Sequence, residues 1–127
     1  MKAIEGRILC ADDNSDTRDL VFLMLRSGGY DVICVGSSAE ALDLLKRERF
    51  DLIVLDNWMP TTTGTELTHL IREFDKTTPI LFYSAAAYKA DKQAALDAGA
   101  QAYLTKPEGI VNLLDEVDRL IRSKLSL

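Results

Sequence analysis

Four of the apolar runs in this 127-residue chain are followed at once by side chains that could bind a metal ion or react with phosphorus. They are the acidic pair Asp12-Asp13, the carboxylate Asp56, the hydroxyl Ser84 and the ammonium Lys106. Three carboxylates at close range raise one another's pKa unless a cation lies between them. The set favours Mg²⁺, because this ion prefers oxygen ligands and keeps several waters. With Mg²⁺ and Lys106 as positive charges and Ser84 as a hydroxyl donor, the same residues would accommodate a phosphoryl group.

This interpretation rests on the whole set and not on any one of its members. The chain contains thirteen Asp residues, and a single Asp at the end of a strand is more often a turn or capping residue than a catalytic one. Asp12-Asp13 alone would therefore carry little weight. The pair together with Asp56, Ser84 and Lys106, each at the end of a different apolar run, is hard to obtain by chance.

Five apolar runs are expected to form the strands that position these residues. The runs do not alternate between apolar and polar residues, which indicates burial on both faces and therefore a parallel sheet covered by helices. They comprise residues 8–11, 32–35, 52–55, 80–83 and 102–104. The run at 32–35 is followed by no titratable residue, so we expect it at an edge of the sheet.

The segments between these runs have the spacing of helices. Apolar residues recur every three or four positions between residues 110 and 121, and shorter stretches of the same kind lie at 20–25, 42–45 and 67–74. The Ala-rich segment 87–98 predicts a helix whose ends are poorly defined. Ser37 and Glu40 have the spacing of a capping box, and Gly28-Gly29 and Gly99 are expected helix ends.

Together these elements predict an α/β fold, a three-layer sandwich in which five βα units form a doubly wound parallel sheet with right-handed crossovers. Ligands of such sheets bind beyond the carboxyl ends of the strands. The length suits one domain spanning residues 1–127. Fifteen basic and twenty acidic residues and a pI near 4.8 argue against direct binding of nucleic acid.

No membrane insertion is expected, since the longest uncharged stretch, residues 77–88, is short of the roughly 18 residues of a membrane helix. The N-terminus shows no secretory signal and there are only two cysteines, so a cytoplasmic location is the simplest expectation. Cys10 and Cys34 are interpreted as small buried hydrophobic residues, and His69 as a solvent-facing side chain.

The chain resembles the receiver domain of two-component response regulators, the family of the single-domain bacterial chemotaxis regulator, over roughly residues 7–124. The most specific match is Asp56-Asn57-Trp58-Met59-Pro60 followed by Gly64, which fits the family pattern D-x-x-M-P-x-x-x-G. The remaining matches, in order and spacing, are Asp12-Asp13, Ser84-Ala85, Tyr103 and Lys106-Pro107. The resemblance implies a flavodoxin-like sheet with strand order 2-1-3-4-5.

The resemblance also implies the role of each site residue. Asp56 would accept a phosphoryl group from the phosphohistidine of a histidine kinase or histidine phosphotransfer protein. Asp13, Asp56 and the main-chain carbonyl of Trp58 would bind Mg²⁺ directly, and Asp12 would bind it through a water. Lys106 would pair with a phosphoryl oxygen, and its peptide bond to Pro107 would be cis.

A conformational switch is implied as well. Ser84 would move toward the phosphoryl oxygens, and Tyr103 would turn into the space that it leaves. The altered surface, from about residue 87 to 125, comprises the fourth helix, fifth strand and fifth helix and would bind a downstream effector or output domain. The protein would be a monomer or weak dimer that acts on itself, and not an enzyme with turnover on a small substrate.

Three alternative functions have requirements that differ from those of a receiver domain. An Asp-nucleophile phosphohydrolase of the haloacid-dehalogenase type would need D-x-D after the first strand, where this chain has adjacent Asp12-Asp13, and a cap or extra strands. A flavin-binding electron carrier would need a phosphate-binding loop where this chain has Asp12-Asp13. A pseudo-receiver that binds partners without phosphorylation is the third alternative. The sequence also leaves open whether the chain stands alone or belongs to a longer regulator or hybrid kinase.

Trp58 and Ala86 bear on the lifetime of a phosphorylated Asp56. Trp58 follows the acceptor by two residues, so its indole could hinder the water that hydrolyses the acyl phosphate. Ala86 follows Ser84 by two residues and has no polar group to orient that water. An equally weighted alternative is that Trp58 covers apolar surface or contacts a partner.

Overall fold

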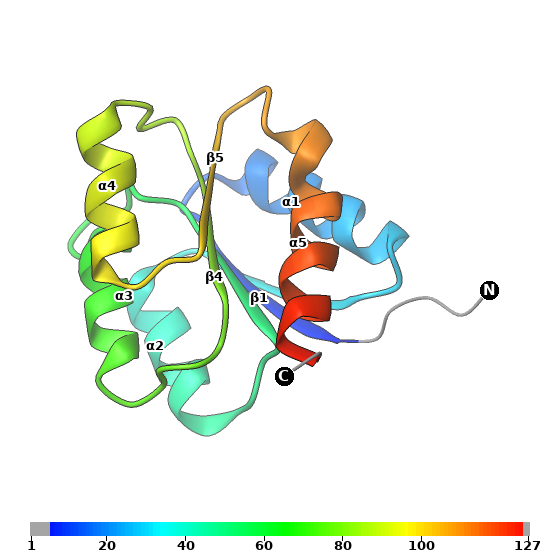
Figure 1. The fold of residues 1–127 in the computed structure, drawn as a ribbon, viewed down its shortest axis with the longest axis horizontal. Helices are drawn as coiled ribbons and strands as arrows, with labels where there is room; N and C mark the ends of the chain where they lie inside the picture. The colour runs from blue at the N-terminus through cyan, green and yellow to red at the C-terminus, as the bar shows by residue number, and fades with distance from the viewer. Residues whose placement is uncertain (1–5, 126–127) are drawn as a thin grey trace.

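The computed structural model describes residues 6–125, in which five strands and five helices alternate along the chain (Figure 1). The strands are β1 (Arg7–Ala11), β2 (Asp31–Val35), β3 (Leu52–Leu55), β4 (Ile80–Ser84) and β5 (Ala102–Thr105). The helices are α1 (Ser15–Ser27), α2 (Ser38–Arg47), α3 (Gly64–Arg72), α4 (Lys89–Ala98) and α5 (Ile110–Leu125). The alternation is the one predicted from the apolar runs.

All five strands are parallel and lie in the order β2-β1-β3-β4-β5, which confirms the predicted sheet. As expected, β2 is an edge strand. Helices α1 and α5 cover one face of the sheet and α2, α3 and α4 cover the other (Figure 1). This arrangement places the carboxyl ends of β1, β3, β4 and β5 along one rim.

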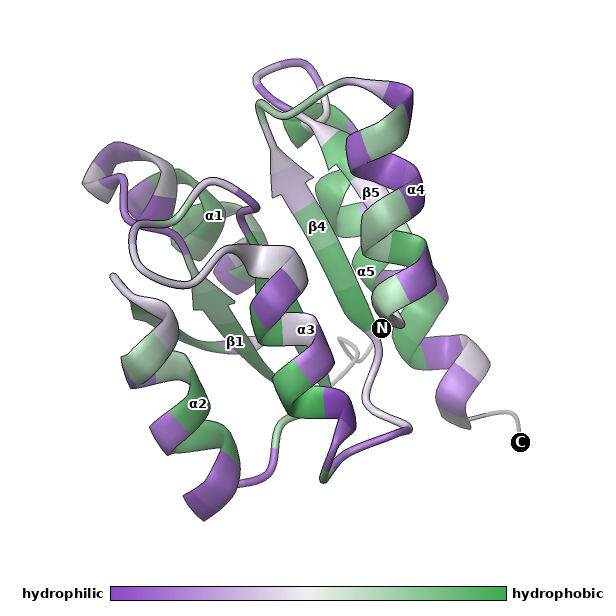
Figure 2. Cartoon of the chain, turned by 90° about the vertical axis from the view of Figure 1, so that its left-hand side faces the viewer, coloured by the Kyte–Doolittle hydropathy of each residue, from purple (hydrophilic) through white to green (hydrophobic). Residues whose placement is uncertain are grey.

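Two apolar clusters hold the helices on the sheet. Successive side chains of a strand point to opposite faces, so Ile8 and Cys10 pack beneath α1 and α5 whereas Leu9 and Ala11 pack beneath the other three helices. β1 and most of β4 are green in Figure 2, and purple patches mark the outer faces of α2, α3 and α4. Burial on both faces explains why the apolar runs do not alternate.

Helix ends follow capping chemistry, with one difference from the prediction. Ser37 caps α2 by accepting the N–H of Glu40, but the Glu40 carboxylate accepts the Ser37 hydroxyl rather than a backbone N–H. A complete capping box lies instead at the start of α3, between Thr63 and Glu66. Gly99 ends α4 with a φ of 122°, as its position in the sequence predicts.

The two cysteines lie side by side, because Cys10 of β1 pairs in register with Cys34 of β2. Both are free thiols; Cys10 is buried and Cys34 is only half-buried, with its thiol directed at the carbonyl of Arg18. His69 is exposed on α3, as expected. Among the helices within residues 6–125, none is long and apolar enough to span a membrane.

Candidate functional site

Three carboxylates that are distant in the sequence meet at the carboxyl rim of the sheet. Asp12 and Asp13 follow β1 and Asp56 follows β3. Backbone bonds hold the first and third in place, since the N–H of Asp12 donates to Val35 and that of Asp56 to Ala11. One oxygen of each carboxylate lies within 4.8 Å of the others. The structure thus brings together the acidic residues that the sequence places at separate strand ends.

The burial of this cluster is uneven. Asp12 is 2% exposed and Asp56 is 5% exposed, whereas Asp13 is open to solvent. A buried carboxylate needs a cation or several hydrogen bonds in order to stay charged. Oxygen donors that are partly buried and partly open to water are the donor set that a hard divalent cation prefers, so the cluster fits Mg²⁺.

Lys106 supplies a fixed positive charge from the end of β5. Its ammonium lies 2.9 Å from a carboxylate oxygen of Asp12 and 3.7 Å from one of Asp56. Burial by itself would lower the pKa of Lys106, but the hydrogen bond with Asp12 and the charge of Asp56 outweigh it, and the net pKa is raised. Lys106 is therefore charged and lies between two carboxylates. The peptide bond from Lys106 to Pro107 is cis, as the resemblance implies.

The carboxyl group of Asp56 has a raised pKa. The first cause is burial and the second is the charge of Asp12. Lys106, a hydrogen bond from the Ser84 side chain and another from the N–H of Trp58 act in the opposite direction. Asp56 is consequently a carboxylate whose negative charge is poorly compensated by the protein alone, which is the condition under which a bound cation contributes most.

Ser84 is fully buried at the end of β4 and is held by two backbone donors. Its Oγ accepts the N–H of Asn57 at 3.3 Å and the N–H of Ala86 at 3.2 Å. Because a hydroxyl oxygen has two lone pairs, these bonds leave its O–H as the group that donates to Asp56. Ser84 thus connects the acidic cluster with the loop that follows β4.

Tyr103 of β5 lies directly behind this serine. Its ring stacks on Phe82 with centroids 5.4 Å apart, and its hydroxyl donates to the carbonyl of Ala86 at 2.5 Å. Burial is the first cause of the raised pKa of its phenol, and the neighbouring side chains of Ser84 and Asn57 oppose this rise. The two residues that the resemblance assigns to a switch are therefore neighbours. Their movement stays a prediction.

Trp58 lies on the solvent side of the loop that joins β3 to α3, and its side chain is 59% exposed. Its neighbour Met59 is 4% exposed and packs into the core. This position is consistent with an indole at the mouth of the site. A main-chain carbonyl of Trp58 that binds metal stays an expectation from the resemblance.

Sequence reasoning missed Asn57, which occupies an unspecified position of the D-x-x-M-P pattern. The residue is 8% exposed, and its side-chain oxygen accepts the N–H and the hydroxyl of Thr65 at 3.2 and 3.0 Å. A polar residue next to the candidate acceptor, in an otherwise buried segment, was the signal available in the sequence. Arg18 was also missed; its guanidinium donates to the carbonyl of Asp12 at 2.8 Å.

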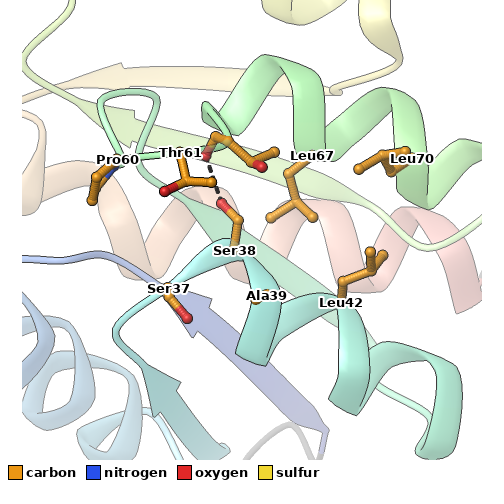
Figure 3. A pocket seen from close by; sticks show the side chains of 9 residues that line it. Ser37, Ser38, Ala39, Leu42, Pro60, Thr61, Leu67 and Leu70 are labelled. Atoms are coloured by element: carbon orange, nitrogen blue, oxygen red, sulfur yellow. Dashed lines mark hydrogen bonds between the residues drawn. The ribbon is translucent and has the colours of Figure 1, made fainter.

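A hollow of about 310 Å³ lies away from this site, between the start of α2 and the loop before α3 (Figure 3). Leu42, Leu67 and Leu70 form its apolar wall, and the Ser38 hydroxyl donates to the carbonyl of Thr62 at 2.7 Å. Its lining includes none of the acidic residues and is separate from the cluster around Asp56.

Comparison with known proteins places this geometry among signalling domains. The family model of the response regulator receiver domain matches residues 8–118. An uncharacterised 14.6 kDa protein of Leptolyngbya boryana is 43% identical over 109 residues, which cover 84% of this chain and 83% of that protein. The response regulator MprA of Mycobacterium leprae is 36% identical over 116 residues, 91% of this chain and 51% of that protein. The chain thus spans about half the length of MprA.

Solved structures show the same fold. The chemotaxis response regulator CheY4 of Vibrio cholerae has 32% identity and a TM-score of 0.85, with 92% of this chain and 99% of that chain covered. The receiver domain of a sensor histidine kinase from Pseudomonas aeruginosa has 32% identity and a TM-score of 0.84, with 93% of this chain and 98% of that chain covered. That receiver domain holds a magnesium ion in its active-site cleft.

Proposed function

Because the chain belongs to the family of response regulator receiver domains of two-component systems, we propose that it accepts a phosphoryl group from a partner phosphohistidine on Asp56. One observation carries the proposal: Asp56 is buried beside Asp12, Asp13 and Lys106 at one rim of the sheet. An acidic nucleophile with fixed charge around it is what phosphoryl transfer requires, since catalysis of this reaction is mostly positioning and electrostatic stabilisation.

In the proposed reaction a carboxylate oxygen of Asp56 attacks the phosphorus of the phosphohistidine. The new P–O bond forms as the P–N bond breaks, and the electron pair of that bond goes to the imidazole nitrogen. The products are an acyl phosphate on Asp56 and a histidine, which leaves as a neutral imidazole because the other ring nitrogen of the phosphohistidine carries a proton. Lys106, 3.7 Å from the Asp56 carboxylate, is placed to pair with an oxygen of the incoming group. Loss of the phosphoryl group to water would regenerate the carboxylate.

Asp12, Asp13 and Asp56 would hold Mg²⁺, together with the carbonyl of Trp58. The ion would neutralise charge on the phosphoryl oxygens. Support comes from the three converging carboxylates and from the magnesium in the related receiver domain of Pseudomonas aeruginosa. The protein's own contribution is to keep these oxygens close together without protonating them, for which the charge of Lys106 is needed.

The proposed output is a change on the face formed by α4, β5 and α5. The Ser84 hydroxyl would turn from the Asp56 carboxylate to a phosphoryl oxygen, and Tyr103 would follow it. Exposed apolar side chains on this side of the molecule, such as Tyr88, Leu96 and Val111, could contact an effector or output domain. The input partner would be a histidine kinase or a histidine phosphotransfer protein. We propose a cytoplasmic module, monomeric or weakly dimeric, with residues 7–124 as one receiver unit.

The test is to incubate the protein with Mg²⁺ and acetyl phosphate and to follow its intact mass. We expect one phosphoryl adduct that is stable to acid and labile to hydroxylamine. The adduct should be lost in Asp56→Asn and retained in Asp43→Asn, a matched control in which an exposed Asp paired with Arg47 is changed. Omission of Mg²⁺ should also prevent it.

Two other outcomes identify the alternatives. Continuous release of phosphate from small phosphoesters, dependent on Asp56, would indicate a phosphohydrolase. Binding of an effector without any adduct in the presence of acetyl phosphate or a phosphorylated kinase would indicate a pseudo-receiver. Either result would overturn the proposed transfer to Asp56.

A further inference from the structure

Asn57 has no part in the proposed phosphoryl chemistry, yet it is among the most extensively hydrogen-bonded residues near the site. Its backbone N–H donates to Ser84 Oγ at 3.3 Å. Its backbone carbonyl accepts the N–H groups of Met59 at 3.1 Å and Gly64 at 2.9 Å. The residue is 8% exposed. A buried amide in this position ties several segments together at once.

The side chain of Asn57 helps to cap α3. The first N–H groups of a helix have no partner within it, and in α3 they are shared between two residues. Thr63 accepts the N–H of Glu66, whereas Asn57 accepts that of Gly64 with its carbonyl and that of Thr65 with Oδ1. Because a backbone N–H can only donate, the amide oxygen must face Thr65.

With the amide oxygen facing Thr65, the amide nitrogen of Asn57 points away from α3 and toward Tyr103. The Asn57 and Ser84 side chains both lie next to the Tyr103 phenol oxygen, whose own proton goes to the carbonyl of Ala86. Because the Ser84 proton is donated to Asp56, the amide nitrogen of Asn57 is the neighbouring group that can donate to this oxygen. Asn57 therefore contacts the Ser84 hydroxyl through its backbone, Tyr103 through its amide nitrogen and α3 through its amide oxygen.

We propose that Asn57 is a positioning residue that couples Ser84 and Tyr103, on one side, to the first turn of α3 on the other. This inference rests on the proposed phosphorylation of Asp56. When Ser84 turns toward a phosphoryl oxygen, it releases the N–H of Asn57. The amide then shifts together with the Tyr103 ring, and the start of α3 shifts with it. Phosphorylation thus changes α3 in addition to the face formed by α4, β5 and α5.

The packing around Gly64 supports such transmission independently of the hydrogen bonds. A Cβ atom on Gly64 would lie 2.4 Å from the carbonyl oxygen of Asp56 and 3.0 Å from the Cα of Asn57. The start of α3 is therefore in direct contact with the backbone that carries the acceptor. Close-packed contacts of this kind pass on a displacement, because they leave no space that could absorb it.

The experiment compares backbone amide resonances of α3 by ¹⁵N NMR before and after phosphorylation with acetyl phosphate, with the adduct on Asp56 quantified by mass. In the parent protein we expect the resonances of Thr65, Glu66 and Leu67 to shift. Asn57→Leu keeps the branched outline of the side chain but removes the amide, so its phosphorylated form should lose the α3 shift. His69→Gln, on the exposed face of α3, is the control and should retain it.

Tyr103→Phe provides a second measurement that does not depend on how well Asn57→Leu folds. It removes one hydroxyl and keeps the ring stacked on Phe82, and it should also reduce the α3 shift. A merely structural role of Asn57 would not link Tyr103 to α3. An α3 shift of parental size in phosphorylated Asn57→Leu or Tyr103→Phe would overturn the coupling, and so would failure of Asn57→Leu to accept the phosphoryl group. Failure of the parent to accept it would instead overturn the proposed function.

Discussion

Replacing Asp56 by Asn should stabilise the protein when no divalent cation is present. The carboxyl group of Asp56 is buried, and its raised pKa shows that the folded protein disfavours its negative charge. Asparagine has nearly the same shape, and its amide oxygen can still accept the hydrogen bonds of Ser84 and of the Trp58 N–H. The substitution therefore removes a poorly compensated charge and leaves no cavity.

The magnitude follows from the distances around Asp56. At an effective dielectric constant of ~20, Lys106 at 3.7 Å attracts the carboxylate by ~4.5 kcal/mol, and Asp12, within 4.8 Å, repels it by at least ~3.5 kcal/mol. These contributions nearly offset each other, while Asp13 adds a repulsion that solvent screens. The remaining contribution is the free-energy cost of burying the charged Asp56 carboxylate. Since replacement of a buried charge by a neutral isostere can stabilise a protein by ~1–4 kcal/mol, we expect about 1–2 kcal/mol here.

The pH dependence of the free energy of unfolding tests separately whether Asp56→Asn stabilises the protein. An acid with a raised pKa holds its proton to higher pH in the folded protein than in the unfolded chain. The free energy of unfolding of the parent therefore falls as the pH rises from the unfolded pKa, near ~3.9, through the raised pKa of Asp56. The advantage of Asp56→Asn should be absent below this window, grow within it and stay constant above it.

The assay is urea unfolding of the parent and Asp56→Asn, with and without MgCl₂. Magnesium at 100 times its dissociation constant should stabilise the parent by about 2.7 kcal/mol, and Asp56→Asn by much less because a ligand is lost. Asp43→Asn, an exposed control, should behave as the parent does. The reasoning would be refuted by an Asp56→Asn protein that is less stable than the parent at neutral pH without metal, or by equal stabilisation of both by magnesium.

Three further predictions concern the surroundings of Asp56. Trp58→Asn should lose its phosphoryl group faster than the parent, measured as decay of the phosphorylated mass after removal of the donor; equal or slower decay would contradict the shielding by the indole. Lys106→Met should lower the rate of phosphorylation by acetyl phosphate about 100-fold or more, whereas a rate near that of the parent would exclude Lys106 from the chemistry. Gly64→Ala should lower the free energy of unfolding in urea by about 1–3 kcal/mol, because its Cβ would lie 2.4 Å from the Asp56 carbonyl and 2.9 Å from the Phe82 ring; unchanged stability would show that α3 can move aside.

The strands could be predicted from the sequence because burial on both faces leaves a visible apolar run. Their ends could not, since four strands extend one residue into polar positions. Arg7 and Asp31 begin β1 and β2, and Ser84 and Thr105 end β4 and β5. These residues join the sheet through backbone hydrogen bonds, which hydropathy does not report. The start of α4 at Lys89, two residues later than expected, likewise depends on the Asp91 carboxylate, which accepts the N–H of Tyr88.

The convergence of Asp12, Asp13, Asp56 and Lys106 could also be predicted, because parallel strands present their carboxyl ends at one rim. Which charged group each side chain pairs with could not be predicted from the sequence. The ammonium of Lys106 lies closer to Asp12 than to Asp56, which depends on side-chain positions and not on strand order. The cap of α3 was missed for a similar reason: Thr63 and Glu66 have the required spacing, but Asn57 adds bonds from outside the helix.

The two residues after Asp56 are both unspecified in the family pattern, yet the structure gives them opposite surroundings. Asn57 is turned inward, against Ser84, Tyr103 and α3, whereas Trp58 is 59% exposed. An inward residue can affect how a change at Asp56 spreads through the protein, and an outward one can affect how water reaches the phosphoryl group. Trp58→Asn should therefore change the lifetime of the phosphorylated form without changing its α3 resonances, and Asn57→Leu should do the reverse. If each substitution changed both properties equally, the two neighbouring positions would share one role, and the separate assignments of Asn57 and Trp58 would be wrong.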